Sequence, residues 1–270
     1  MIDEARIESM ADALVAAPGV CAVALGGSRA RGTHHDDSDV DLGVYYRSDE
    51  LDIDVLADLA AEQVGERVEI AGPGEWGPWV DGGAWLTVAR VPVDWILRDV
   101  NRVRRQRDRA LRGEFAFHQQ IGHPLGFLDV AYAGEVALGV PLADPDGVLA
   151  ALRADLTSYP VALRRALLDN VWQAGFLLDN AEKALARSDS TYIALSCSVA
   201  ALICAHAWHA DAGQWVVNEK DLVPHVRTLG ARAGDFCDLV DRSMTSLGAA
   251  GGGPAAAIAL VREAVALTPR

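Results

Sequence analysis

The segment from Leu25 to Tyr46 constrains this chain most: an apolar run leads through Gly-Gly-Ser to a second run that opens with Asp39-Val40-Asp41. Side chains of a strand alternate between its two faces, so Asp39 and Asp41 are expected to project from one face of a strand over 39–46. Two carboxylates held that close repel each other unless a cation lies between them. Mg²⁺ meets this need, because proteins usually bind it with one or two carboxylates together with substrate phosphates.

The glycines before this strand predict a turn that can approach a ligand closely. Gly27 has no Cβ to keep the ligand away, and the helix start that follows offers free N–H groups to an anion. Ser28 is expected either to contact a phosphate or only to cap that short helix. The segment therefore predicts a phosphate-binding turn beside a metal site. The alternative is that Asp39 and Asp41 are solvated acids of an acid-rich turn, since Asp36 and Asp37 precede them.

Hydrophobic periodicity divides the chain into two kinds of structure. The first part predicts a helix over 3–17, strands over 20–25 and 39–46, a helix over 50–63, and a hairpin of strands over 84–88 and 91–97. The second part is rich in alanine and leucine and predicts helices over 127–139, 147–157, 160–187, 190–210 and 255–267. The predicted fold class is α+β, a small mixed-sheet domain followed by an α-helical bundle.

Charge marks the boundary between these parts. The chain has a net charge of −14; residues 1–100 carry 20 acidic and 7 basic side chains, whereas residues 101–114 carry 6 arginines and 2 acids. This reversal places the predicted boundary after Glu114, giving domains 1–114 and 115–270. An acidic surface argues against a binder of bulk DNA, which needs positive charge to displace counterions, and favours cationic small molecules as partners.

The arginine run has a definite geometry if it is helical. Arg102, Arg105, Arg109 and Arg112 then share one face, at intervals of three, four and three. They are expected either to pair with acids of the first domain or to form a phosphate-binding stripe for RNA or nucleotide.

At these residues the sequence resembles a known family. Gly27-Ser28 followed by Asp39-Val40-Asp41 is similar to the signature of the nucleotidyltransferase superfamily that includes DNA polymerase beta and the aminoglycoside nucleotidyltransferases. The resemblance covers about residues 20–100 and implies a third carboxylate on a later strand. Asp94, in VPVDWIL, is the matching position, and Glu69, in RVEI, is the rival. Asp94 could instead be a strand-end residue paired with Arg90 or Arg98.

The resemblance also implies a reaction: a substrate hydroxyl attacks the α-phosphorus of an NTP, here expected to be ATP, and pyrophosphate leaves. Asp39 and Asp41 would hold Mg²⁺, and Asp94 would ligate a second ion or take the proton of the hydroxyl. Gly27, Ser28 and Lys220 are the expected nucleotide-binding residues, with a plain surface lysine as the alternative for Lys220.

Three functions follow for testing. The first is transfer of a nucleotide to a small hydroxylated, cationic acceptor such as an aminoglycoside, which would confer antibiotic resistance. The second is nucleotidylation of tRNA or of a protein, as in toxin–antitoxin systems. The third is a catalytically inactive nucleotide-binding module.

The remaining features predict structural roles. The four cysteines are scattered, which is typical of reduced thiols in a cytoplasmic protein. The uncharged stretch 192–210 is expected to be a buried core helix and no membrane span. His206 and His209 are expected to be core or surface side chains, and His34-His35 either a nucleotide contact or a solvated loop pair. Trp172, Phe176 and Tyr192 are expected to be core residues, with a platform for substrate as the alternative.

Overall fold

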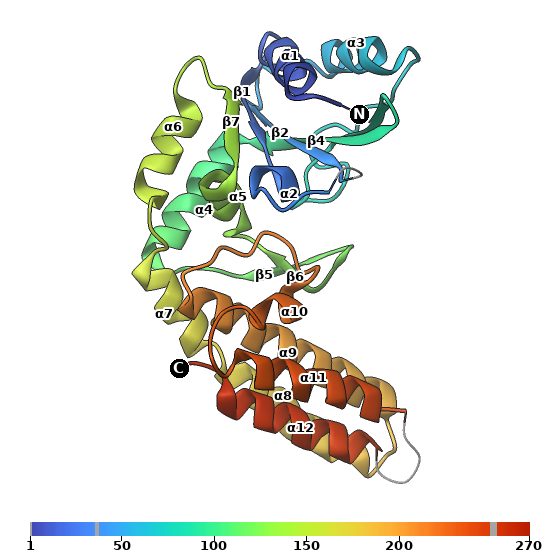
Figure 1. Ribbon diagram of the computed structural model, residues 1–270, viewed down its shortest axis with the longest axis vertical. Coiled ribbons are helices and arrows are strands. Elements are labelled where there is room, and N and C mark those ends of the chain that lie inside the picture. The colour runs from blue at the N-terminus through green and yellow to red at the C-terminus, as the bar shows by residue number, and fades with distance from the viewer. Residues whose placement is uncertain (1, 36–37, 249–252) are drawn as a thin grey trace. The chain divides into compact units, whose positions relative to one another are not determined.

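The computed structural model describes residues 2–35, 38–248 and 253–270 and divides them into two compact units. The first unit comprises residues 1–109 and 129–157, and the second comprises residues 110–128 and 158–270. Each unit has its own hydrophobic core. The predicted α+β class, with a mixed-sheet part and a helical part, is confirmed (Figure 1).

The first unit is built on a sheet with strand order β3-β4-β2-β1-β7. Its strands are β1 (Val20–Leu25), β2 (Val40–Tyr46), β3 (Gly83–Val88), β4 (Val91–Asp99) and β7 (Val140–Ala143). β2 and β4 are parallel, whereas β1 is antiparallel to both β2 and β7, and β3 is antiparallel to β4. The sheet is therefore mixed, as the sequence predicts.

One face of this sheet is the core of the first unit. The side chains of Val40, Leu42, Val93 and Trp95 are buried there with those of α1 (Glu4–Val15) and α3 (Ile53–Val64), which lie together on one side of the strands in Figure 1. Asp3 and Asp52 cap these helices by accepting hydrogen bonds from backbone N–H groups of the first turn. The short helix α2 (Gly27–Ala30) lies on the opposite side in the same view.

The chain returns to the first unit at residues 129–157, after the arginine run. The predicted division into domains 1–114 and 115–270 does not describe this return. β7 pairs with β1, and α5 (Ala131–Leu138) carries Glu135, whose carboxylate receives two hydrogen bonds from Arg98 at 2.6 and 2.8 Å. Edge pairing and a buried ion pair thus bind residues 129–157 to the sheet. Neither leaves a signal in local composition.

Other elements complete the chain. They are α4 (Val100–Arg112), β5 (Phe117–Gln120), β6 (His123–Leu128), α6 (Val148–Arg153), the 3-10 helix η1 (Ala154–Leu156), α7 (Val161–Asp169), α8 (Trp172–Leu185), α9 (Ser190–Asp211), α10 (Leu222–Val226), α11 (Ala233–Ser246) and α12 (Gly253–Leu267). The predicted helix over 160–187 is two helices, because the chain turns at 170–171, and α11 was not predicted.

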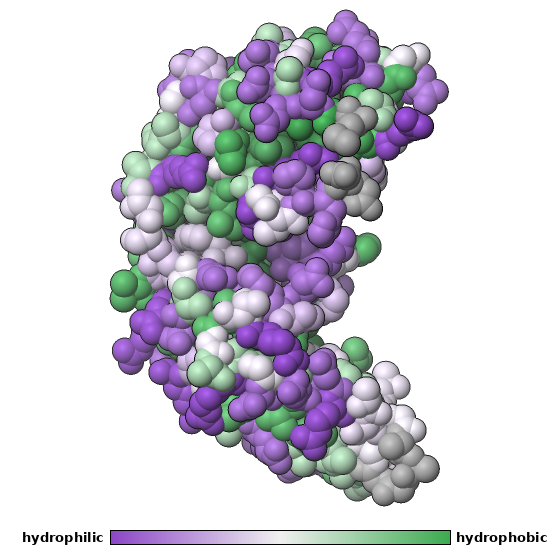
Figure 2. Space-filling view, viewed as in Figure 1, coloured by the Kyte–Doolittle hydropathy of each residue, from purple (hydrophilic) through white to green (hydrophobic). Residues whose placement is uncertain are grey.

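The second unit packs its helices around α9. This helix is long and apolar enough to span a membrane by length and composition, but 72% of its most apolar window is buried within the protein. Its apolar residues therefore pack in the bundle core, together with those of α8, α11 and α12. Hydrophilic side chains cover much of the outer surface of both units in the view of Figure 2, with hydrophobic ones scattered among them.

The cysteine and histidine predictions can be checked in this fold. Cys21, Cys197, Cys204 and Cys237, all within the described residues, are buried and form no disulfide. His206 and His209 are 2% and 3% exposed, so both are core residues. Burial lowers the pKa of His206 to about 3 and that of His209 to about 4, because the charged imidazolium would lose its hydration.

These buried histidines predict acid sensitivity of the helical unit. In the unfolded chain each titrates near pH 6.5, so between pH 6.5 and about 4 the unfolded state binds protons that the folded state does not. As the pH is lowered through this range, the free energy of unfolding should decrease by as much as about 1.4 kcal/mol per pH unit for each histidine. Urea unfolding followed by circular dichroism at pH 7, 6 and 5 measures the slope. His206→Phe should flatten it, whereas His34→Asn, at an exposed position, should not. An equal slope in His206→Phe and the parent would contradict the assignment.

Candidate active site

Two predicted site residues, Asp41 and Asp94, are direct neighbours in the sheet. The parallel pairing of β2 with β4 aligns Asp41 with Asp94, between the aligned pairs Val40–Val93 and Leu42–Trp95. Paired residues of adjacent strands project from the same face, and neighbouring strands lie about 4.8 Å apart. The flanking pairs are buried, so the two carboxyl groups stand together on the face opposite the core. Both side chains are half-buried.

The glycine turn adjoins this carboxylate pair. Gly26 donates a backbone hydrogen bond to the carbonyl of Asp41 at 2.8 Å, which continues the row of strand neighbours toward β1. Gly27 has φ +61°, and a Cβ at this position would overlap Oδ2 of Asp41. Glycine therefore lets the start of α2 lie against that carboxylate, whereas any other residue would displace the carboxylate and strain the backbone. The predicted proximity of turn and acid is present in the structure.

The third predicted acid, Asp39, lies immediately before β2 and is exposed. Its backbone is held by Arg29 of α2: Nε donates to the carbonyls of Asp39 at 3.1 Å and Ser38 at 3.3 Å, and Nη2 donates to Ser38 at 2.8 Å. One guanidinium thus fixes the approach to the strand. Sequence reasoning missed this role of Arg29. The neighbouring Asp36 and Asp37 lie outside the described residues.

The structure favours Asp94 over Glu69 as the later carboxylate. Glu69 is exposed on a coil between α3 and the bridge at Ala71, not on a strand next to β2. Arg98, offered as an alternative partner of Asp94, is buried with Glu135 instead. The alternation of β4 thus presents Asp94 beside Asp41, while Arg98 secures α5.

The donor chemistry of this pair fits Mg²⁺. Within the part of the chain that the structure describes, no three His, Cys, Asp or Glu side chains gather closely enough to hold a metal by themselves. Two adjacent carboxylates are nevertheless the usual protein share of a Mg²⁺ site, whose other ligands are water and substrate phosphate oxygens. Asp41 and Asp94 would hold the ion. The structure does not bring Asp39 close enough to complete a three-acid group with them, and its joining them when the ion binds stays a prediction.

The nucleotide-binding predictions fall in both units. Gly26, not Ser28, is the N-cap residue of α2, so the capping alternative for Ser28 is wrong. Ser28 is half-buried at the start of α2, beside Gly27. Lys220 is exposed in the turn before α10 of the second unit, and His34 and His35 are exposed in the loop after α2. Their contacts with nucleotide stay predictions.

Most of the arginine face is held in ion pairs. Arg102 bonds the carbonyl of Pro78 and lies 3.9 Å from the Asp81 carboxylate, and Arg109 lies 3.2 Å from that of Asp129. Arg112 pairs with Glu114 at 2.8 Å, while Arg105 is exposed. These contacts favour the ion-pair interpretation of the run over a phosphate-binding stripe.

Two tryptophans that sequence reasoning missed extend the acid row. Trp85 of β3 pairs with Asp94 across the sheet, and its side chain is 69% exposed. The indole of Trp76 stacks on it, with ring centroids 4.1 Å apart and planes inclined by 12°. The alternation of the predicted strand 84–88 could have indicated this position of Trp85. Trp85 lies between the core residues Ala84 and Leu86 and therefore faces away from the core.

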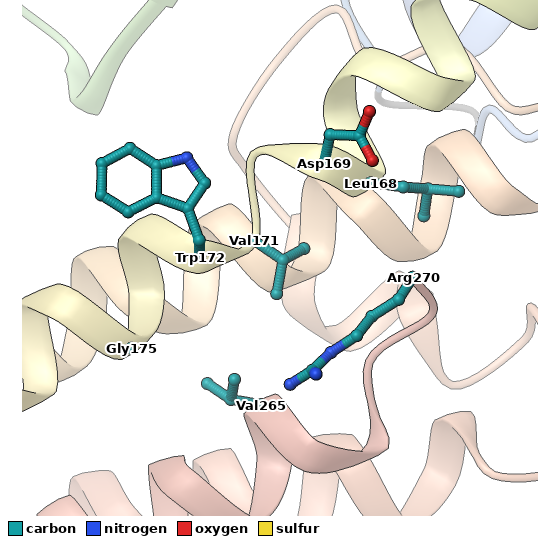
Figure 3. Close-up of a pocket in the computed structure, with 7 residues that line it drawn as sticks. All are labelled: Leu168, Asp169, Val171, Trp172, Gly175, Val265 and Arg270. Carbon is teal, nitrogen blue, oxygen red and sulfur yellow. The ribbon is translucent and has the colours of Figure 1, made fainter.

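A separate cavity lies in the second unit. It measures about 350 Å³ and is lined by Leu168, Asp169, Val171, Trp172, Gly175, Val265 and Arg270. Figure 3 shows the Arg270 side chain extending toward Val265 between α8 and α12, while the indole of Trp172 points away from it. The prediction that Trp172, Phe176 and Tyr192 are core residues is wrong, because all three are exposed on α8 and α9. No predicted site residue lines this cavity.

Comparison with known proteins finds a family similar to part of the first unit. Residues 7–74 match the family described as the nucleotidyltransferase domain. The matched stretch contains the glycine turn, Asp39 and Asp41. The match supports a nucleotidyltransferase enzyme. No curated protein matches the chain significantly. A solved nucleotidyltransferase-like protein from Exiguobacterium sibiricum 255-15 is similar at a TM-score of 0.47 and 11% identity, over 96% of this chain and 74% of that one.

Gly27 provides a matched test of the glycine turn. Gly27→Ala and Gly32→Ala both place alanine at positive φ, +61° and +67°, which costs each variant about 1 kcal/mol of stability. A Cβ at position 32 meets nothing within 4 Å, whereas one at position 27 overlaps the Asp41 carboxylate. Nucleotidyl transfer should therefore fall at least about tenfold in Gly27→Ala and stay near the parent level in Gly32→Ala. Equal activity of the two folded variants would refute the contact with Asp41.

Arg29 offers a test of how Asp39 is positioned. Arg29→Ala removes all three hydrogen bonds to residues 38 and 39, so the Mg²⁺ concentration giving half-maximal transfer should rise about tenfold. Arg31→Ala removes an exposed arginine two residues away and is the control. Arg29→Lys should restore little, because an ammonium lacks the fork of donors that reaches two carbonyls. A Mg²⁺ dependence unchanged in Arg29→Ala would remove the positioning role.

Proposed function

We propose that the protein transfers a nucleoside monophosphate, AMP from ATP, to a hydroxyl group of a small cationic acceptor such as an aminoglycoside-type antibiotic, with Mg²⁺ as cofactor. One observation carries the proposal: the alignment of Asp41 with Asp94 beside a turn in which glycine leaves room for the Asp41 carboxylate. The family match supports nucleotidyl transfer in general. ATP, magnesium and the acceptor are the proposed refinements.

The residues divide the work of such a transfer. The turn at Gly26-Gly27 and the hydroxyl of Ser28 would bind the triphosphate, since backbone at a helix start attracts anions. Asp41 and Asp94, with Asp39, would hold Mg²⁺, which supplies charge neutralisation on the phosphate oxygens and the departing pyrophosphate. Lys220 would add a positive charge to the triphosphate.

The reaction is a balanced substitution at phosphorus. The acceptor oxygen forms a bond to the α-phosphorus, and the bond from that phosphorus to the oxygen bridging the α- and β-phosphates breaks. Pyrophosphate leaves with the electron pair of the broken bond. The proton of the acceptor hydroxyl passes to the Asp94 carboxylate, which acts as general base, and from there to solvent.

The acceptor class rests on charge. The first 100 residues have 13 more acidic than basic side chains, and this field attracts cations. A tRNA acceptor is less favoured, because Arg102, Arg109 and Arg112 are held in ion pairs. An inactive nucleotide-binding module would need no pair of aligned acids on the open face of the sheet, so it is the weaker alternative.

The proposal predicts a sharp difference between two acid-to-amide substitutions. Asp94→Asn should lower transfer at least about 100-fold, because it removes both a metal ligand and the proton acceptor. Glu69→Gln, at the exposed rival position, should retain parental activity. The assay incubates the protein with Mg²⁺ and ATP labelled at the α-phosphate, with kanamycin or bulk tRNA as acceptor.

Each outcome of this assay decides between the candidate functions. Label on kanamycin supports the proposal, and label on tRNA would replace it by the second function. Full activity of Asp94→Asn, or a loss confined to Glu69→Gln, would contradict the assignment of the later carboxylate. Binding of ATP without transfer to any acceptor would favour the inactive module.

A further inference from the structure

The stacked indoles of Trp76 and Trp85 lie at one end of the row of site residues. Crossing the sheet from β1 to β3, the row runs from the Gly26-Gly27 turn through Asp41 and Asp94 to Trp85. Each step is one strand spacing, so Trp85 is about 10 Å from Asp41 and about 5 Å from Asp94. The phosphate-binding turn and the tryptophan pair therefore flank the acids on opposite sides.

This position matters because Trp85 is costly to expose. Its side chain is 69% accessible on a strand whose adjacent residues, Ala84 and Leu86, are buried. Burying an indole is worth several times the gain from burying a methyl group, so covering Trp85, which stacks on the half-buried Trp76, would favour the binding of a ligand.

The loop that carries Trp76 is built to hold it. Residues 71 and 83 close the loop with two backbone hydrogen bonds of 2.8 Å, and the Trp76 N–H donates to the carbonyl of Asp81 at 2.9 Å. The buried carboxylate of Asp81 accepts from Tyr46 Oη at 2.8 Å and from the Gly74 N–H at 3.0 Å. Burial and the neighbouring Asp81 raise the pKa of Tyr46, so its hydroxyl stays protonated and donates. The indole of Trp76 is thus placed before any ligand arrives.

We propose that Trp76 and Trp85 form the binding subsite for the acceptor, and that this acceptor carries a ring bearing ammonium groups, as an amino sugar does. The subsite rests on the proposed function and specifies where its second substrate binds. A flat indole face takes the C–H face of a sugar ring, and tryptophan is the best aromatic partner for a cation. The adjacent Asp94 adds negative charge on the same face.

A nucleobase could also stack on an indole. The order of the turn, the acids and Trp85 across the sheet distinguishes the nucleobase from the acceptor. The triphosphate is expected at the Gly26-Gly27 turn, on the other side of the acids from Trp85. The attacking hydroxyl must approach the α-phosphorus opposite the departing pyrophosphate, which is the side of Asp94 and Trp85. The acceptor is therefore the ligand that the position favours.

The test measures the binding of both substrates to the full chain. Isothermal titration gives the Kd of kanamycin A, with Mg²⁺ and a non-hydrolysable ATP analogue present, and separately the Kd of that analogue with Mg²⁺. Trp85→Ala should raise the kanamycin Kd about tenfold and leave the analogue Kd unchanged. Trp85→Phe should recover part of the loss, and sucrose, an uncharged sugar, should bind more weakly than kanamycin. Trp172→Ala removes an equally exposed indole, 66% accessible in the second unit, and should change neither Kd.

The other outcomes overturn distinct parts of the argument. A rise in the analogue Kd instead would assign the indoles to the nucleobase and refute the acceptor subsite. A parent protein that binds the Mg²⁺-bound analogue but no kanamycin, or a kanamycin Kd unchanged in Trp85→Ala, would refute the subsite while nucleotidyl transfer stands. A parent protein that does not bind the analogue would overturn the proposed function itself, and the subsite with it.

Discussion

Backbone pairing between β2 and β4 determines where the acids of this protein lie. A shift of one residue in that register would turn Asp94 toward the core and bring Val93 to the open face. Such a slip would bury an unpaired carboxylate and expose a valine, and each of these changes costs free energy. The apolar face of the two strands, packed against α1 and α3, therefore holds two mutually repelling carboxylates side by side. Apolar packing on one face of the sheet thus offsets the repulsion between the carboxylates on the other face.

The residues around this pair reduce the cost of holding it. Gly27 lets the start of α2, with its free N–H groups, lie against the Asp41 carboxylate. Arg29 directs its charge to the backbone carbonyls of residues 38 and 39, just before β2. A buried ion pair joins Arg98 of β4 to Glu135 and holds α5 against the sheet. The backbone geometry of the turn and of the strand start thus determines where the site acids lie.

Local patterns in the sequence were enough to place β1, β2, β3 and β4 and the two acids Asp41 and Asp94. Alternation gave the strands and the face of Asp41, and the valine- and leucine-rich context of Asp94 gave its strand. Features that depend on distant pairing were not accessible: β7 is too short and too mixed to be seen before it pairs with β1. The exposure of Trp172 was misjudged for a related reason, since an aromatic residue at helical spacing says nothing about whether a neighbouring helix covers it. Arg29 and Trp76 act through tertiary contacts: Arg29 bonds a carbonyl ten residues away, and Trp76, in a loop, stacks on an indole of β3.

The position of β3 has a consequence for specificity. It is an edge strand whose neighbour in the sheet is β4, and its first residue, Gly83, also bonds Ala71, so its outward side chains do not set the register that aligns Asp41 with Asp94. Substitutions at Trp85 or Thr87 change the open face without disturbing the core on the other side of the strand. The acids lie on the inner strands β2 and β4, where a change of backbone geometry affects the neighbouring strands on both sides. A sheet arranged in this way can alter the ring that it accepts while its phosphate chemistry stays the same, because the two properties belong to different strands.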